Sequence, residues 1–232
     1  MFKNLFKKKN PKSERPVLIC IHGFGKRKTV EYANLVSALE DEYDMVLPEL
    51  FDQRYKDDIV WHNWVSRAEE KIIEAKNNHR QIILIGFSMG GVIATYLASK
   101  FQIERLVLIS PAFDYKNIAT LLTSLKSLDK NKKPIPDEDQ YVELPGEFTK
   151  TFMQVVDNCH DAIKGLHCPV LFMAAMGDEL IPYTVSLEYY KLVPHENKNC
   201  IIFADGCHRI LDDPHINKMA ITMIKDFIEK KF

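Results

Sequence analysis

The feature that most constrains this chain is a short motif, GFSMGG at residues 86–91, between an apolar segment and an alanine-rich one. The apolar segment at 81–85 is typical of a buried strand, and the segment from Met89 to about Lys100 is typical of a helix. The motif matches G-x-S-x-G, a sharp strand-to-helix turn that lifts a serine hydroxyl above a sheet. Glycine flanks the serine in such a turn because a Cβ would clash there. We therefore interpret Ser88 as a candidate nucleophile rather than as a chance match in a loop.

The rest of the chain alternates between predicted strands and predicted helices. Helical spacing of apolar residues predicts helices at 31–43, 61–75, 184–191 and 214–230. Continuous apolar runs predict strands at 16–21, 45–47, 81–85, 106–109, 169–174 and 199–204. This alternation predicts an α/β fold, with a mostly parallel sheet of about six strands and helices on both faces. We expect residues 16–232 to form a single domain.

The alternation is interrupted between residues 113 and 167. Helical apolar faces are predicted around 118–128 and 148–163, with a polar, proline-bearing loop at 129–146 between them. Because this insertion directly follows a strand beside the serine motif, we expect a helical lid over the site. The alternative is that these helices belong to the body of the domain.

A nucleophilic serine needs a base, and the base needs an acid that orients it. His208 follows the last predicted strand in the loop ADGCH, and Asp178 follows the preceding strand in MGDELIP. The chain order is therefore serine, acid, histidine. Glu179, Asp205 and Asp114 are alternative acids, and the other histidines considered are His22, His160, His167, His195 and His215.

Attack on a carbonyl also needs donors for the developing oxyanion. The residue after the serine supplies one backbone N–H, that of Met89, and the loop HGFG at 22–25 suits the other, with the Phe24 N–H as donor. We expect His22 to stiffen this loop by hydrogen bonding rather than to act as a base. Seven of the nine glycines fall in the four loops named here, which supports reading them as one site.

Four motifs, HGFG, GFSMGG, GDELIP and DGCHRIL, together resemble the α/β-hydrolase superfamily, in particular small bacterial carboxylesterases and monoglyceride lipases. The resemblance covers about residues 16–232 and implies a serine acyl-enzyme mechanism on carboxylic esters, without a cofactor or a metal. It implies Ser88 as nucleophile, His208 as base and Asp178 as acid, with the Phe24 and Met89 N–H groups as oxyanion donors. One departure is that few residues precede the first strand, so we expect the two opening strands common in this fold to be absent. The other is Ala175, at a position where relatives often have glycine.

Composition narrows the range of partners. The chain has 31 basic and 32 acidic residues, so no overall field favours nucleic acid as a partner. No apolar run is long enough to span a bilayer. Five cysteines without disulfide or zinc spacing predict free thiols, and the lack of a secretory signal predicts a cytoplasmic protein.

Residues 1–15 carry six basic residues against one acidic residue. We expect a disordered leader, because terminal segments are usually loose. The alternative is weak contact with an anionic membrane surface, because Phe2, Leu5 and Phe6 are interspersed among the charges.

The leading hypothesis is a serine esterase that acts on lipophilic short- to medium-chain esters or monoacylglycerols. The predicted apolar lid residues that favour a lipophilic acyl chain are Leu121, Leu122, Leu125, Phe148 and Phe152. The alternatives are a ligand-binding or sensor protein that keeps this scaffold, and a related hydrolase such as a thioesterase or C–C hydrolase.

Overall fold

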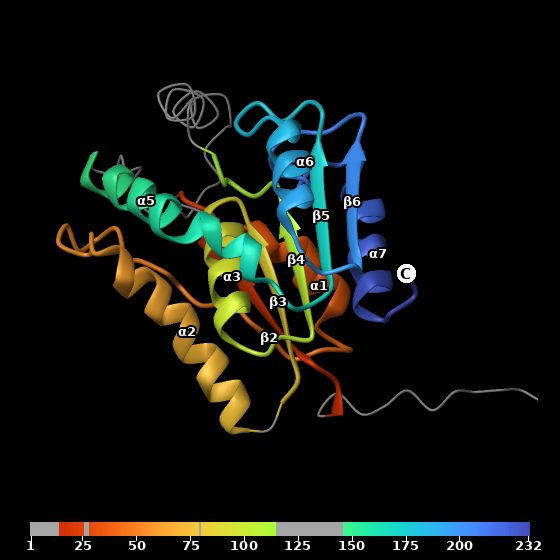
Figure 1. Cartoon of the computed structure of the whole chain (residues 1–232), viewed down its shortest axis with the longest axis horizontal. Coiled ribbons are helices and arrows are strands. Elements are labelled where there is room, and N and C mark those ends of the chain that lie inside the picture. The colour runs from red at the N-terminus through yellow and green to blue at the C-terminus, as the bar shows by residue number, and fades with distance from the viewer. Residues whose placement is uncertain (1–13, 26–27, 79, 115–145) are drawn as a thin grey trace, which may run out of the picture.

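The structure is a computed structural model, and it describes residues 14–25, 28–78, 80–114 and 146–232 (Figure 1). Its centre is a six-stranded sheet in the order β2-β1-β3-β4-β5-β6, and every pairing is parallel. The strands are β1 (Val17–Ile21), β2 (Met45–Val46), β3 (Ile82–Phe87), β4 (Arg105–Ile109), β5 (Val170–Ala175) and β6 (Lys198–Phe203). The predicted six-stranded parallel sheet is confirmed.

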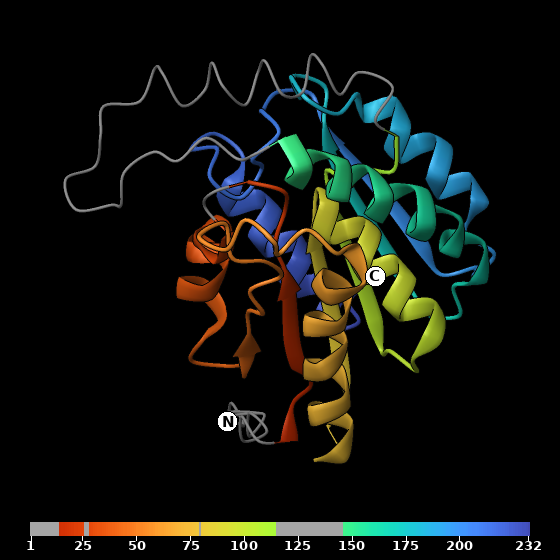
Figure 2. The ribbon, with the colours of Figure 1, turned by 90° about the vertical axis from the view of Figure 1, so that its left-hand side faces the viewer.

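Helices cover both faces of this sheet (Figures 1 and 2). Helices α1 (Ala33–Leu39) and α7 (Asn217–Ile228) lie on one face, and the short 3-10 helix η2 (Lys28–Tyr32) precedes α1. The opposite face is covered by α2 (Trp61–Asn77), α3 (Met89–Lys100), α5 (Gly146–Cys159), the 3-10 helix η3 (His160–Gly165) and α6 (Tyr183–Leu192).

The sheet divides the hydrophobic core into two clusters. Along β1, the side chains of Ile19 and Ile21 join the cluster beneath α2 and α3, whereas those of Leu18 and Cys20 join the cluster beneath α1 and α7. Strands buried on both faces need apolar residues at every position. This explains why the sequence shows continuous apolar runs instead of an apolar–polar alternation.

Two helices begin later than the sequence predicts. In place of the predicted helix at 31–43, the 3-10 helix η2 leads into α1, which ends at Leu39. At their junction the buried Tyr32 hydroxyl lies 2.8 Å from the Ile21 carbonyl oxygen and 3.1 Å from that of Ile85. The predicted helix from residue 214 begins at Asn217. There Asp213 accepts a hydrogen bond from the His215 N–H (2.9 Å), which forms a turn before the helix.

The described half of the predicted lid is packed against the body of the domain. Helix α5 lies against α2 and α3, and the Phe148 and Phe152 side chains are completely buried in the main core cluster. This packing favours the alternative reading for α5. The other predicted lid helix and its loop, at 118–146, lie almost entirely outside the described residues, and movement of the segment as a lid stays a prediction.

The predicted leader also lies largely outside the described residues, including its proposed membrane contact. Arg15, at its end, is held by an ion pair with Glu42 (3.2 Å) and lies over the Tyr43 ring. None of the described helices is both long and apolar enough to cross a membrane. All five cysteines are free thiols, as predicted.

Candidate active site

The serine motif forms a strained turn between β3 and α3. Ser88 has φ 52° and ψ −119°, a backbone conformation that L-residues rarely adopt. Its N–H donates to the Ile109 carbonyl oxygen (2.9 Å), and its own carbonyl oxygen accepts from the Gly91 and Ala112 N–H groups (2.9 and 3.1 Å). Strain of this kind persists where the surrounding structure fixes it, and it clusters at functional sites.

Glycine is required at position 90 by a close approach of two backbones. A Cβ placed on Gly90 would lie 1.9 Å from the Ile21 carbonyl oxygen at the end of β1. That distance is far inside van der Waals contact, and the obstructing atom belongs to the backbone of the central sheet. The turn can therefore lie directly against β1 only with glycine here. Gly25, in contrast, would meet nothing within 4 Å, so it is not needed for space.

Asp178 and His208 come together at the ends of β5 and β6. The His208 Nδ1 lies 2.9 and 3.1 Å from the two carboxylate oxygens of Asp178, and both side chains are buried. Asp178 Oδ1 also accepts hydrogen bonds from the Leu180 and Ile181 N–H groups (2.9 and 2.8 Å). A carboxylate facing Nδ1 places the proton of a neutral imidazole on that nitrogen, which leaves Nε2 as the acceptor.

The acid and histidine loops are in direct backbone contact. A Cβ on Gly177 would lie 2.5 Å from the Gly206 carbonyl oxygen, and Gly206 has φ +112°. Glu179, one of the alternative acids, accepts a hydrogen bond from the His208 backbone N–H (3.1 Å) instead of contacting the imidazole. The histidine is therefore held by Asp178 at its ring and by Glu179 at its backbone.

The serine turn, the HGFG loop and the histidine loop meet at the carboxyl edge of the sheet. The Phe87 ring, one residue before the serine, lies 4.9 Å from the His208 ring. A Cβ on Gly23 would lie 3.2 Å from the Ser88 Cβ. Ligands of open α/β sheets bind at this edge.

The HGFG loop is fixed by hydrogen bonds from both sides. The buried His22 ring accepts from the Leu50 N–H at Nε2 (3.0 Å), so its Nδ1 carries the proton and donates to the Gly23 carbonyl oxygen (2.7 Å). The Gly23 N–H donates to Glu31 Oε2 (2.9 Å). The expectation that His22 stiffens the loop is confirmed.

The two predicted oxyanion donors are brought to this place by different elements. Met89 is the first residue of α3, where a backbone N–H has no partner within the helix. Phe24 follows Gly23 in the loop, and its ring stacks on that of Phe152 in α5 (5.1 Å). The buried Phe152 ring thus supports the loop.

Sequence reasoning missed two carboxylates beside the site. Asp213 accepts from the Cys207 and His215 N–H groups (3.1 and 2.9 Å), which shapes the loop around His208 and lowers the Asp213 pKa. In the sequence this acid only indicated the start of a helix. Glu31 is buried, and its burial raises its pKa. Only the unusual position of an acid close behind the HGFG loop could have drawn attention to it.

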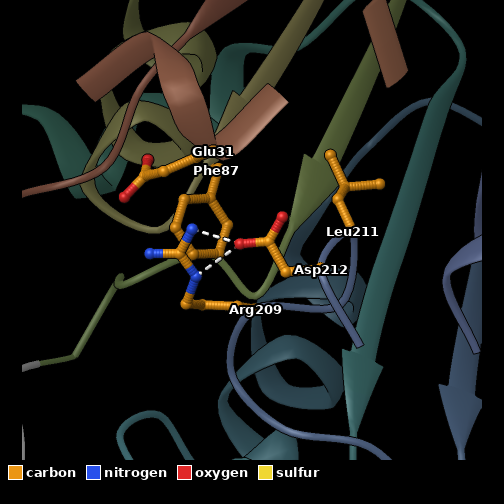
Figure 3. A pocket seen from close by; sticks show the side chains of 5 residues that line it. All are labelled: Glu31, Phe87, Arg209, Leu211 and Asp212. Carbon is orange, nitrogen blue, oxygen red and sulfur yellow. Dashed lines mark hydrogen bonds and ion pairs between the residues drawn. The ribbon is translucent and has the colours of Figure 1, made fainter. Parts of the chain in front are cut away.

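A small pocket lies next to this edge, and it is lined by Glu31, Phe87, Arg209, Leu211 and Asp212 (Figure 3). Arg209 donates to Asp212 through Nε (2.7 Å) and Nη2. Glu31 and Asp212 lie on opposite sides of its guanidinium group. Among the described residues, no group of three or more His, Cys, Asp or Glu side chains could hold a metal ion.

Comparison with known proteins places this geometry in context. A thermostable monoacylglycerol lipase of Bacillus sp. (strain H-257) is 27% identical over 153 residues, which is 60% of this chain and 61% of that protein. The chain thus spans about three-fifths of the length of the curated relatives that it matches, 61% in each case.

Two solved structures share the fold. A Paleococcus ferrophilus monoacylglycerol lipase has a TM-score of 0.68 at 18% identity, covering 92% of this chain and 95% of that one. A structure from work on the metagenome-derived lipolytic enzymes LipS and LipT has a TM-score of 0.76 at 15% identity, covering 94% of each chain. A family model described as alpha/beta hydrolase fold matches residues 16–154. With this match, the parallel sheet and the strained serine turn, the chain belongs to the alpha/beta hydrolase family.

Proposed function

We propose that this protein is a serine hydrolase that cleaves carboxylic esters through an acyl-enzyme on Ser88. The observation that carries the proposal is the buried contact between His208 Nδ1 and the Asp178 carboxylate (2.9 Å), beside a strained serine turn. An imidazole held in this way has its Nε2 available as a base, and the carboxylate stabilises the imidazolium that forms.

The chemistry needs two acyl-transfer steps. In the first, His208 Nε2 takes the proton of Ser88 Oγ as that oxygen bonds to the ester carbonyl carbon. The tetrahedral intermediate then collapses, the carbon–oxygen bond to the alcohol breaks, and the alcohol leaves with the proton from His208. In the second, His208 removes a proton from water as the water oxygen bonds to the acyl carbon. The bond from that carbon to Ser88 Oγ then breaks, Ser88 Oγ takes the proton back from His208, and the carboxylic acid is released.

The proposed oxyanion donors are the N–H groups of Phe24 and Met89. The Gly23 N–H already donates to Glu31, so Phe24 is the next donor in the loop. Met89 supplies the first N–H of α3, which has no acceptor within the helix and lies where the helix dipole also favours negative charge. Each such donor is worth about 3 kcal/mol of transition-state stabilisation.

For the substrate, we propose lipophilic short- to medium-chain esters or monoacylglycerols. Support comes from the relatives, two of which are monoacylglycerol lipases. Phe148 and Phe152 no longer support it, because both rings are buried against other aromatic rings. The other apolar residues invoked, Leu121, Leu122 and Leu125, lie outside the described residues.

The test is steady-state hydrolysis of p-nitrophenyl esters from acetate to palmitate and of a monoacylglycerol, with the Ser88→Ala variant beside the wild type. We expect Ser88→Ala to fold normally and to lose turnover completely, and we expect medium-chain esters to be preferred. Substantial esterase activity in Ser88→Ala would refute the nucleophile. A wild type that binds esters tightly without turnover would favour the ligand-binding alternative.

A further inference from the structure

The HGFG loop is linked to the sheet by η2, through residues that are not part of the proposed serine, histidine and acid triad. Tyr32 lies at the end of η2, is completely buried, and has its hydroxyl within hydrogen-bond distance of carbonyl oxygens on both β1 and β3. These contacts fix η2 to the two central strands. Glu31, the preceding residue, therefore extends from a rigid support.

From this support, Glu31 reaches back to the loop. Its Oε2 accepts the Gly23 N–H at 2.9 Å, across eight residues of chain, and only 8% of the residue is exposed. A hydrogen bond from a backbone N–H to a buried carboxylate is among the stronger kinds. Together with the His22 bond to the Gly23 carbonyl oxygen, it holds the two peptide groups on either side of the Gly23 Cα, and the second of these carries the Phe24 N–H.

The placement of Gly23 decides where the next N–H points. With the Gly23 N–H occupied, the Phe24 N–H is the donor that the loop can offer at Ser88, and Gly23 itself lies against the Ser88 Cβ. Transition-state stabilisation depends on donors that are already aimed, because reorganising them during the reaction costs rate. A loop that shifted by about 1 Å would lose much of this effect.

Glu31 is also close to the other side of the site. It lines the same pocket as Arg209, which directly follows His208, and the Arg209 charge is already paired with Asp212 (Figure 3). Burial raises the pKa of Glu31, while the hydrogen bond from the Gly23 N–H and the nearby Arg209 and His208 favour its ionised form. Variants that change the hydrogen bond and the charge of Glu31 one at a time are therefore needed to separate their effects.

We propose that Glu31 is a positioning residue that aims the oxyanion loop through its hydrogen bond to the Gly23 N–H. This inference rests on the proposed serine hydrolase function. It assigns Glu31 no contact with the substrate and no part in proton transfer. By holding Gly23 in place, Glu31 directs the Phe24 N–H toward the oxyanion.

The test compares three variants at this position in the full chain. Glu31→Ala removes the acceptor, Glu31→Asp keeps the charge but shortens the reach, and Glu31→Gln keeps the reach and an acceptor oxygen without the charge. Hydrolysis of a p-nitrophenyl ester gives kcat and KM separately, and thermal unfolding monitors the fold. Glu42→Ala is the matched control, because Glu42 is a half-buried glutamate that pairs with Arg15 and Lys225 away from the site.

We expect Glu31→Ala and Glu31→Asp to lower kcat by about 10- to 100-fold, the scale of a 1 Å misplacement, with KM changed less than about threefold. Glu31→Gln should stay within about threefold of the wild type, and Glu42→Ala should be unchanged in kcat. If Glu31→Ala does not fold, the contrast between Glu31→Asp and Glu31→Gln decides.

The opposite order, with Glu31→Asp active and Glu31→Gln impaired, would overturn positioning in favour of a charge effect. Normal kcat in all three variants would also overturn it, while loss of activity in Ser88→Ala would leave the proposed function standing. A wild type without any esterase activity would overturn both.

Discussion

The serine turn is held by backbone atoms, whereas the loop that carries His208 is held by side-chain carboxylates. At the serine, the constraints are the contact of Gly90 with the β1 backbone and the bonds from Ser88 to β4 and its following loop. At the histidine, Asp178, Glu179 and Asp213 accept from its ring, its N–H and the preceding N–H. The serine turn should therefore be sensitive to added volume, and the histidine loop to loss of charge.

The largest expected effect is a loss of kcat when a carboxylate that holds His208 is removed. Asp178→Asn should lower kcat by about 10⁴-fold, because an amide at this place favours the wrong imidazole tautomer. The fold should survive, since the substitution preserves shape. The measurement is kcat for a p-nitrophenyl ester, with the exposed Asp205→Asn as the control. If Asp178→Asn stays active while Asp205→Asn or Asp114→Asn loses most of its kcat, Asp178 is not the catalytic acid.

On the backbone side, Gly90→Ala should destabilise the fold by about 3 kcal/mol, at the upper end for overpacking. The added Cβ would lie 1.9 Å from the Ile21 carbonyl oxygen, and the central sheet cannot move away. Chemical denaturation gives the change in free energy of unfolding. Gly165→Ala is the matched control, because its Cβ would meet only the Ser99 Cβ, at 3.7 Å. Equal stability of the two variants would remove the proposed steric requirement.

A smaller effect, the pH dependence of folding stability, is expected for the histidine loop because a carboxylate holds it. Hydrogen bonds from the His215 and Cys207 N–H groups lower the Asp213 pKa, so the Asp213 carboxylate stabilises the fold above its unfolded pKa of about 4. This contribution is lost as the pH falls through the folded pKa. Asp213→Asn should therefore cost about 1 kcal/mol at pH 7 and progressively less toward pH 3. Thermal unfolding across this range tests it, and a pH-independent difference would contradict the charge-based account.

The smallest effect is expected from the N-terminus, which belongs to neither region. Removal of residues 1–12 should leave hydrolysis of a soluble ester unchanged, because the described contacts of the site lie elsewhere in the chain. Co-sedimentation with phosphatidylserine vesicles tests the proposed membrane contact. Binding by the full chain and not by the truncated one supports it, and an absence of binding by the full chain ends it.

The difference between the serine turn and the histidine loop also explains which parts of the site the sequence could predict. The serine turn is encoded locally, since GFSMGG and its flanking strand and helix are contiguous, and continuous apolar runs identify strands that are buried on both faces. Asp178 and His208 could be proposed because each follows a strand, and parallel strands end at one edge.

The supporting residues could not be predicted in this way. Glu31 and Asp213 bind backbone N–H groups that the folded loops bring to them, and no side-chain pattern records such a partner. The apolar face at 148–163 predicted a helix, which the structure has as α5 followed by the 3-10 helix η3. It did not predict the partner of that helix, because amphipathic spacing is the same for a lid and for a helix packed on α2 and α3.

The most direct test of the central claim is labelling with a fluorophosphonate, followed by mass-spectrometric mapping of the modified peptide. This reagent phosphonylates only a serine that is activated by a base and faces an oxyanion hole. We predict a single adduct on Ser88, strongly reduced in Asp178→Asn and absent in Ser88→Ala. An unlabelled wild type, or an adduct that persists in Ser88→Ala, would contradict it.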